Sequence, residues 1–210
     1  MGDDLFGDNQ GLETVRMPDA EVYFLPRIAL GALAMNVMNE LIREIPWRQE
    51  KITVWGKSHD QPRLVAWYGD PGRRYTYSGI KLDPLPWTRL LQDVRDRIES
   101  VADTRFNSVL LNYYRNERDS MGLHSDDEPE LGKHPIIASL SLGEERVFIM
   151  KHKVRKELKP VRIKLPSGSF LVMKGTTQQF WKHGIDKETR RLGARVNLTF
   201  RQIFQNGSTA

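Results

Sequence analysis

Cysteine is absent from this sequence of 210 residues. Disulfides, thiolate zinc sites and a cysteine nucleophile are therefore excluded, and the absence is consistent with a reducing compartment. No stretch approaches the roughly 20 apolar residues of a transmembrane helix. The N-terminus is acidic over residues 1–4 and lacks the apolar segment of a secretory signal. We expect a cytoplasmic protein that has no membrane partner.

Motifs of several other enzyme classes are also missing. The sequence has no G-x-S-x-G nucleophile elbow, no G-x-x-x-x-G-K-[ST] phosphate loop and no H-E-x-x-H zinc motif, which argues against a hydrolase. With 39% hydrophobic and 28% charged residues, a chain of this length can bury one complete core. We expect a single domain over residues 21–204, flexible tails at 1–20 and 205–210, and by default a monomer.

Positive charge exceeds negative charge and is concentrated in two places. The formal net charge is +5 and the isoelectric point is near 9.4, which permits a polyanionic partner without requiring one. Residues 151–164 contain seven Lys or Arg side chains and one Glu, and Arg190 and Arg191 form a second, smaller cluster. The longer run is either a hairpin kept soluble by its charge or a surface that contacts phosphates.

Hydrophobic periodicity divides the chain into a helical part and a strand-rich part. Apolar residues recur at intervals of three and four over residues 29–45 and again from 84 to 101, which predicts two amphipathic helices. From residue 106 the period is two, and turn residues separate predicted strands at 108–115, 136–142, 146–150, 161–165, 169–173, 177–181 and 195–201. We therefore expect an α+β, mainly β, protein whose core over 106–203 is a double-stranded β-helix, or jelly roll.

Three side chains have the ligand types of a metal site. His124 and Asp126 lie two residues apart and would point to the same face of an extended segment. A second histidine, His183, follows after several predicted strands. Two histidines and one carboxylate form the facial triad that binds non-haem Fe(II) and leaves coordination positions open. The His-x-Asp pair alone is weak evidence, because a histidine beside acidic residues most often belongs to a solvated turn.

The last predicted strand, 195–201, alternates strictly between polar and apolar residues. Arg195, Asn197, Thr199 and Arg201 therefore share one face. This face could be the solvated side of an ordinary antiparallel strand. If it points inward, its two guanidinium groups could hold both ends of a small dicarboxylate, because the rigid fork of arginine pairs with a carboxylate through two hydrogen bonds. An iron triad beside paired arginines implies O₂ activation driven by 2-oxoglutarate.

These motifs, joined by Asn112-Tyr113-Tyr114 in another predicted strand, resemble the AlkB family of Fe(II)/2-oxoglutarate dioxygenases over residues 50–203. Members of this family remove methyl groups from alkylated nucleobases by oxidation. The resemblance implies that the catalytic Fe(II) ligands are His124, Asp126 and His183. It also implies a site for 2-oxoglutarate formed by Asn112, Tyr114, Arg195, Asn197 and Arg201.

Residues 50–80 combine arginines with the aromatic side chains of Trp55, Trp67, Tyr68, Tyr75 and Tyr77. Such a mixture suits base stacking and phosphate contact. It could equally be a β-hairpin with cross-strand aromatic pairs, which is the interpretation favoured for Trp67 and Tyr68. By resemblance the segment is a nucleotide-recognition lid, in which Tyr77 stacks on the extruded base and Trp55 wedges into the duplex. Family members active on double strands carry Phe at the Trp55 position.

Further residues are expected to contact alkylated DNA. Asp127 and Glu128 could accept a hydrogen bond from an exocyclic amino group, and the resemblance favours Glu128. The remaining candidates are Tyr75 and Ser78 in the lid, and Arg190 and Arg191 in the smaller basic cluster.

The resemblance implies oxidative demethylation of 1-methyladenine and 3-methylcytosine in DNA, with Fe(II), O₂ and 2-oxoglutarate, and release of succinate, CO₂ and formaldehyde. The base must leave the helix before reaction, which costs a few kcal/mol and costs least for a lesion that already pairs badly. Two alternatives stay open. One is an RNA demethylase or protein hydroxylase with the same fold, and the other is a nucleic-acid-binding module with an inactive metal site.

Overall fold

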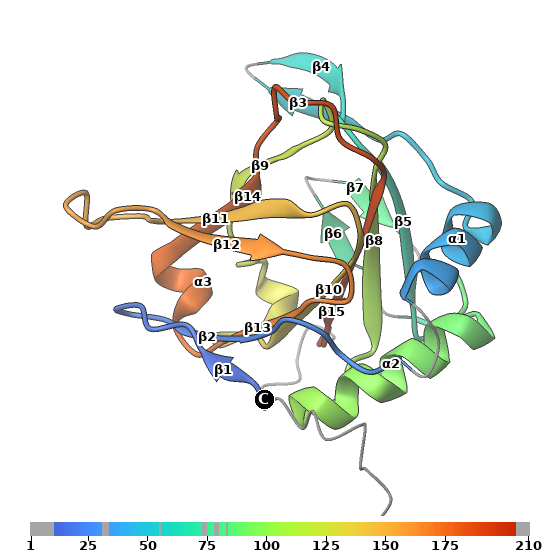
Figure 1. Ribbon diagram of the computed structural model, residues 1–210, viewed down its shortest axis with the longest axis horizontal. Helices are drawn as coiled ribbons and strands as arrows, with labels where there is room; N and C mark the ends of the chain where they lie inside the picture. The colour runs from blue at the N-terminus through green and yellow to red at the C-terminus, as the bar shows by residue number, and fades with distance from the viewer. Residues whose placement is uncertain are drawn as a thin grey trace, which may run out of the picture.

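Two antiparallel sheets form the body of the molecule. The computed structural model describes residues 11–30, 34–54, 56–72, 75–77, 80–82 and 84–204. Figure 1 shows the two sheets, with helices α1 (Ala34–Glu44) and α2 (Arg89–Ala102) outside the larger one. Among the helices of these ranges, none is both long enough and apolar enough to cross a bilayer.

The larger sheet has seven strands in the order β1-β2-β13-β10-β15-β8-β5. Their bounds are β1 Glu13–Thr14, β2 Glu21–Leu25, β13 Phe170–Lys174, β10 Ile137–Gly143, β15 Arg195–Arg201, β8 Ser108–Tyr114 and β5 Leu64–Gly69. The smaller sheet has the order β12-β11-β14-β9. Its strands are β12 Val161–Leu165, β11 Arg146–His152, β14 Trp181–Ile185 and β9 Met121–His124.

Short elements connect and flank these sheets. Two hairpins lie within the segment that resembles a lid: β3 Lys51–Val54 with β4 Lys57–Asp60, and β6 Tyr75–Tyr77 with β7 Ile80–Leu82. A 3₁₀ turn, η1 (Pro129–Leu131), follows the loop after β9, and a one-turn helix, α3 (Thr177–Phe180), precedes β14. Antiparallel strands in two sheets with few helices agree with the expected jelly-roll architecture.

Side-chain alternation along β15 divides the larger sheet into an outer and an inner face. Val196, Leu198 and Phe200 lie in one buried cluster with the apolar stripes of α1 and α2. The polar residues between them line a cavity together with residues of the smaller sheet. Because successive side chains of a strand point to opposite faces, helices cover the outer face while the inner face is available for a site.

The two helices meet the outer face through regular apolar stripes. In α1 the stripe is Val37, Met38 and Leu41. In α2 the hydroxyl of Thr88 accepts a hydrogen bond from the Leu91 backbone N–H at 3.2 Å, which satisfies one of the amide groups that a helix start leaves unpaired. Their packing makes the larger sheet a rigid support for the inner face.

One segment differs from its predicted secondary structure. The sequence predicts a strand over 177–181, whereas Thr177–Phe180 forms the helical turn α3 and the strand begins at Trp181. Gly175, with φ +57°, turns the chain just before it. The Thr177 hydroxyl then donates a hydrogen bond to the Lys174 carbonyl oxygen at 2.6 Å, a local bond that competes with strand pairing.

Residues 11–20 also differ from expectation. The prediction of a flexible tail over 1–20 is wrong for this part, because β1 pairs with β2, and the Trp181 indole N–H donates to the Pro18 carbonyl oxygen at 2.9 Å. Main-chain and single side-chain bonds of this kind need few apolar residues, so composition did not indicate them. The other predicted tail residues, 1–10 and 205–210, lie outside the described residues.

Candidate metal and cosubstrate site

A cavity lies between the inner face of the larger sheet and the smaller sheet. The larger sheet contributes Tyr114, Ser139, Met173, Arg195, Asn197, Thr199 and Arg201. The smaller sheet contributes Met121, His124, Phe148, His183 and Ile185. The cavity therefore contains both histidines of the predicted triad and all four residues of the polar face of β15.

The three predicted metal ligands converge although 57 residues separate Asp126 from His183 in sequence. His124 and His183 are register partners on β9 and β14, and their ring centroids lie 4.4 Å apart. His124 Nε2 is 3.6 Å from Asp126 Oδ1. One potential ligand atom from each of the three residues lies within 4.8 Å of the others, which is close enough for a single ion to be shared.

Hydrogen bonding and charge set the protonation of these ligands. His124 Nδ1 lies 3.0 Å from the Gly122 carbonyl oxygen, so Nδ1 carries the proton and Nε2 presents its lone pair. Burial lowers the pKa of His183 to about 3, and the neighbouring His124 acts in the same direction. Near neutral pH both rings are uncharged, which is the form that binds a metal.

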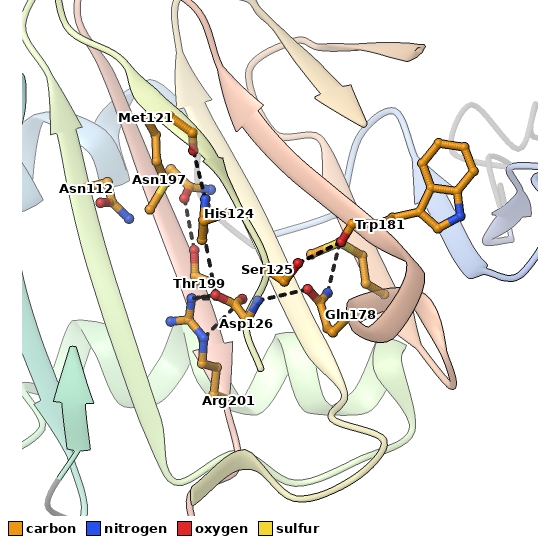
Figure 2. A network of polar contacts seen from close by, with 12 residues as sticks. Asn112, Met121, His124, Ser125, Asp126, Gln178, Trp181, Asn197, Thr199 and Arg201 are labelled. Atoms are coloured by element: carbon orange, nitrogen blue, oxygen red, sulfur yellow. Dashed lines mark hydrogen bonds and ion pairs between the residues drawn. The ribbon is translucent and has the colours of Figure 1, made fainter. Parts of the chain in front are cut away.

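Asp126 is a buried carboxylate that a guanidinium group stabilises. Burial acts to raise its pKa, but Arg201, His183 and His124 outweigh burial and lower the pKa to about 2. Arg201 Nη2 donates to both carboxylate oxygens at 2.9 Å, as Figure 2 shows. Two neutral imidazoles and one carboxylate are the donor set of non-haem Fe(II) sites, so the residues present fit that metal.

The segment that carries Asp126 is held by α3 and β14. The Asp126 backbone N–H donates to Gln178 Oε1 at 3.0 Å, and the Ser125 hydroxyl donates to the Trp181 carbonyl oxygen at 2.9 Å (Figure 2). Gln178 is 1% exposed. Gln178 therefore positions the proposed ligand Asp126 through its backbone N–H and does not contact its carboxylate.

Replacing Gln178 by Ala should weaken Mn(II) binding about 10–100-fold, because outer partners of metal ligands commonly have effects of this size. Mn(II) affinity can be measured by electron paramagnetic resonance on metal-free protein. Gln179→Ala is the matched control, since Gln179 lies in the same helical turn but is exposed and contacts the Lys133 carbonyl oxygen instead. Equal affinities for the two variants would contradict the positioning role of Gln178.

The polar face of β15 is buried, so it is not a solvated strand face. Arg195 is 2% exposed and Arg201 is 1% exposed. Asn197 Nδ2 donates to Ser139 Oγ at 2.8 Å, and the Thr199 hydroxyl donates to Asn197 Oδ1 at 3.0 Å. Polar contacts thus continue along the inner face between the two arginines.

Arg195 has spare hydrogen-bonding capacity inside the cavity. Its Nη2 donates to Ser141 Oγ at 2.9 Å, whereas Nε and Nη1 are buried and have no partner in the described part of the chain. Burial lowers the pKa of the guanidinium group and the nearby Arg146 acts in the same direction, whereas Tyr114 acts to raise it. Buried donors without partners are costly, and a ligand carboxylate such as that of 2-oxoglutarate would satisfy both.

Two other residues expected at the 2-oxoglutarate site have clear positions. The Tyr114 ring lines the cavity, and the Arg195 guanidinium carbon lies 4.9 Å from its centroid. Asn112 is opposite Asn197 in register and accepts a hydrogen bond from Arg63 Nε at 2.8 Å. Arg201 also lines the cavity, and its guanidinium group pairs with Asp126; its contact with 2-oxoglutarate stays a prediction.

Sequence reasoning missed several residues of this site. They are Arg63, Met121, Ser139, Ser141, Phe148, Met173, Gln178 and Ile185. The alternation of Ser139 and Ser141 with apolar neighbours could have indicated a second polar inner face. Phe148 stacks on His183 at 5.2 Å between ring centroids, and nothing in its sequence context signals that contact.

The candidate DNA-contact residues are only partly described. Asp127 is mostly exposed and pairs with Lys153 at 3.1 Å, and Glu128 is partly buried. Arg190 and Arg191 are exposed in the loop between β14 and β15. Trp55 and Ser78, and the side chains of Tyr75 and Tyr77, lie outside the described residues.

Comparisons with a family model and with curated relatives indicate the same protein family. A model of the 2OG-Fe(II) oxygenase superfamily matches residues 21–201. The human alpha-ketoglutarate-dependent dioxygenase alkB homolog 3 is 43% identical over 176 residues, which are 80% of this chain and 61% of the relative. The mouse DNA oxidative demethylase ALKBH2 is 42% identical over 181 residues, which are 82% of this chain and 76% of the relative.

A solved structure supports the fold. The structure of OsALKBH1 superposes with a TM-score of 0.58 at 18% identity and covers 91% of this chain and 99% of its own. The chain spans 59–62% of the length of the alkB homolog 3 relatives. The family match extends over every strand of the two sheets except β1, and over the triad and the inner face of β15. The chain therefore belongs to the AlkB family within the 2OG-Fe(II) oxygenase superfamily, which implies Fe(II), 2-oxoglutarate and O₂ as the groups that it uses.

Proposed function

We propose that this chain oxidatively demethylates N-alkylated bases, 1-methyladenine and 3-methylcytosine, in DNA. The observation that carries the proposal is the cluster of His124, Asp126 and His183 beside a cavity that Arg195 lines, where Nε and Nη1 of Arg195 have no hydrogen-bond partner in the described residues. Relatives at about 40% identity are named as a DNA oxidative demethylase. An iron triad and a carboxylate-binding arginine in one buried space suit a 2-oxoglutarate-dependent oxidation.

The residues of the site have different roles in this reaction. When bound, Fe(II) with 2-oxoglutarate and O₂ supplies the oxidation of the N-methyl group, which then leaves as formaldehyde. His124, Asp126 and His183 would hold the metal through neutral nitrogens and a carboxylate oxygen. Arg201 keeps Asp126 anionic, and Arg195 orients the cosubstrate. Burial of these groups between two sheets excludes bulk water and strengthens each charge interaction.

A basic groove on the outer face of the smaller sheet supports a nucleic-acid substrate. Leu123 precedes the proposed ligand His124, and Lys182 precedes His183. Lys151 and Lys182 are register partners on β11 and β14. The groove is lined by Leu123, Lys151, His152, Lys153, Lys156 and Lys182. Lysines that follow a groove can neutralise successive phosphates, so the basic run favours phosphate contact over a purely solubilising role.

Charge near the metal favours a cationic lesion, since 1-methyladenine and 3-methylcytosine are positively charged. Asp127 is mostly exposed and forms an ion pair with Lys153. Glu128, partly buried and two residues beyond Asp126, is the better partner for an exocyclic amino group. We also propose the lid roles of Trp55, Tyr75, Tyr77 and Ser78, and phosphate contact by Arg190 and Arg191.

The direct test is formaldehyde and succinate release from 1-methyladenine oligonucleotides in the presence of Fe(II) and 2-oxoglutarate. We expect both products from wild-type protein and neither from His183→Ala. Comparison of single-stranded with double-stranded DNA tests the wedge role of Trp55, and a matched RNA tests the RNA alternative. Release of succinate without formaldehyde would exclude demethylation of 1-methyladenine. If protein that holds iron releases neither product, the alternative of a nucleic-acid-binding module with an inactive metal site would be favoured.

The proposal includes a cytoplasmic, monomeric protein. Light scattering during size-exclusion chromatography would give one chain per particle, and a dimer would refute that part alone.

A further inference from the structure

Two buried guanidinium groups near one end of the cavity have no carboxylate partner. Arg146 is 1% exposed and Arg195 is 2% exposed, and neither forms an ion pair in the described ranges of the chain. Asp119, Asp186 and Glu188 act on Arg146 electrostatically without forming an ion pair with it, and Asp119 is already bound by Arg115. A buried cation is costly unless an anion accompanies it, so the two guanidinium groups favour an anionic ligand beside them.

Arg146 lies where two loops and a strand meet. It is the first residue of β11, and its guanidinium group donates to the carbonyl oxygens of Asn116, Asp119 and Asp186. The first two belong to the loop between β8 and β9, and the third follows β14. Arg146 thus fixes the ends of the strands that carry Tyr114 and His183, although it does not line the cavity.

Both guanidinium groups lie beside the same aromatic ring. The Arg146 guanidinium carbon is 5.7 Å from the Tyr114 ring centroid, and that of Arg195 is 4.9 Å from it. Tyr114 and Arg195 are register partners on β8 and β15. Arg195 and Arg201 stand at opposite ends of β15, and Arg201 binds the proposed ligand Asp126. The two cations therefore lie beside Tyr114 at the Arg195 end of β15, opposite the end at which Arg201 binds Asp126, and of the two only Arg195 lines the cavity.

We propose that Arg146 is a positioning and specificity residue for the cosubstrate. Its charge, added to that of Arg195, favours a keto acid whose end remote from the metal carries a second carboxylate. Acting through Tyr114 and Arg195, it selects a dicarboxylate over a monocarboxylate of the same chain length. The inference rests on the proposed use of 2-oxoglutarate. A unit charge at about 10 Å in a protein interior changes affinity by about tenfold.

The test separates the charge of Arg146 from its hydrogen bonds. Arg146→Gln removes the charge, and Arg146→Lys keeps the charge but cannot reproduce the planar fork. Arg162→Gln is the control, because Arg162 is exposed on the adjacent strand β12. Calorimetry of the Mn(II)-loaded proteins without O₂ measures binding of 2-oxoglutarate and of 2-oxopentanoate, which has the same carbon chain and one carboxylate.

Wild type and Arg162→Gln should prefer 2-oxoglutarate strongly. Arg146→Gln should lose about tenfold in 2-oxoglutarate affinity with little change for 2-oxopentanoate, and Arg146→Lys should keep most of the preference. Equal losses for both ligands in Arg146→Gln would show that Arg146 only holds the loops, and would overturn the proposal.

The lysine variant keeps the test decisive if the glutamine variant does not fold, because loss of preference in Arg146→Lys also overturns the proposal. Absence of 2-oxoglutarate binding in wild type would instead refute the proposed function itself.

Discussion

Arg195→Met should bind 2-oxoglutarate about 100-fold more weakly than wild-type protein, while its metal-free form should unfold no more easily. Removing one member of a buried charge pair commonly costs 2–5 kcal/mol of binding free energy, and each 1.4 kcal/mol is tenfold in affinity. Without ligand, the guanidinium donates to Ser141 Oγ, and within the described residues it pairs with no carboxylate, while its Nε and Nη1 have no hydrogen-bond partner. Methionine fills similar space without the desolvation cost of a charge.

Two measurements are needed for this variant. Calorimetry with Mn(II)-loaded protein gives the affinity for 2-oxoglutarate, and urea unfolding of metal-free protein gives the free energy of unfolding. Arg162→Met, on the exposed side of β12, is the control for both. Affinity within a few-fold of wild type would contradict the assignment of Arg195, and a loss of several kcal/mol in stability would show that its charge is compensated in the protein alone.

Arg201→Met should have the opposite effect on stability and lower the free energy of unfolding of metal-free protein by about 3–5 kcal/mol. Arg201 and Asp126 form a close pair in which each side chain is 2% exposed. Removing the guanidinium leaves the Asp126 carboxylate buried beside two neutral imidazoles. Urea unfolding in the presence of a chelator measures the change.

A double-mutant cycle isolates this interaction from other contacts of Arg201. Asp126→Asn alone leaves a buried guanidinium without its carboxylate and should also destabilise the protein. The double variant Asp126→Asn with Arg201→Met should lose less stability than the sum of the single changes, because neither charge is then left uncompensated. Strictly additive losses would be evidence against a coupled pair.

The strands were the most predictable part of the fold, and β15 shows why. Its period of two follows from burial on both sides, with helices against Val196, Leu198 and Phe200 and a polar cavity against the residues between them. The predicted strand and the observed one have the same bounds, 195–201. Local alternation is sufficient when each face meets a different environment along its whole length.

The partners of the polar residues could not be predicted in the same way. The sequence predicts a contact of Arg201 with a ligand carboxylate, but it gives no sign of the pairing of Arg201 with Asp126, 75 residues earlier in the chain. Gln178 and Arg146 act through main-chain groups of distant segments. Contacts of this kind depend on how the two sheets pack against each other, and no local sequence pattern indicates that packing.

Strand β15 links two parts of the larger sheet that have no other strand in common. It pairs with β10 on one side and with β8 on the other, and it is the last strand along the described chain. Chains emerge from the ribosome N-terminus first, so β8 and β10 are made before the strand that joins them. Arg195 and Arg201 therefore take their places in the cavity only when β15 joins β8 and β10, so the polar inner face and the complete sheet form together.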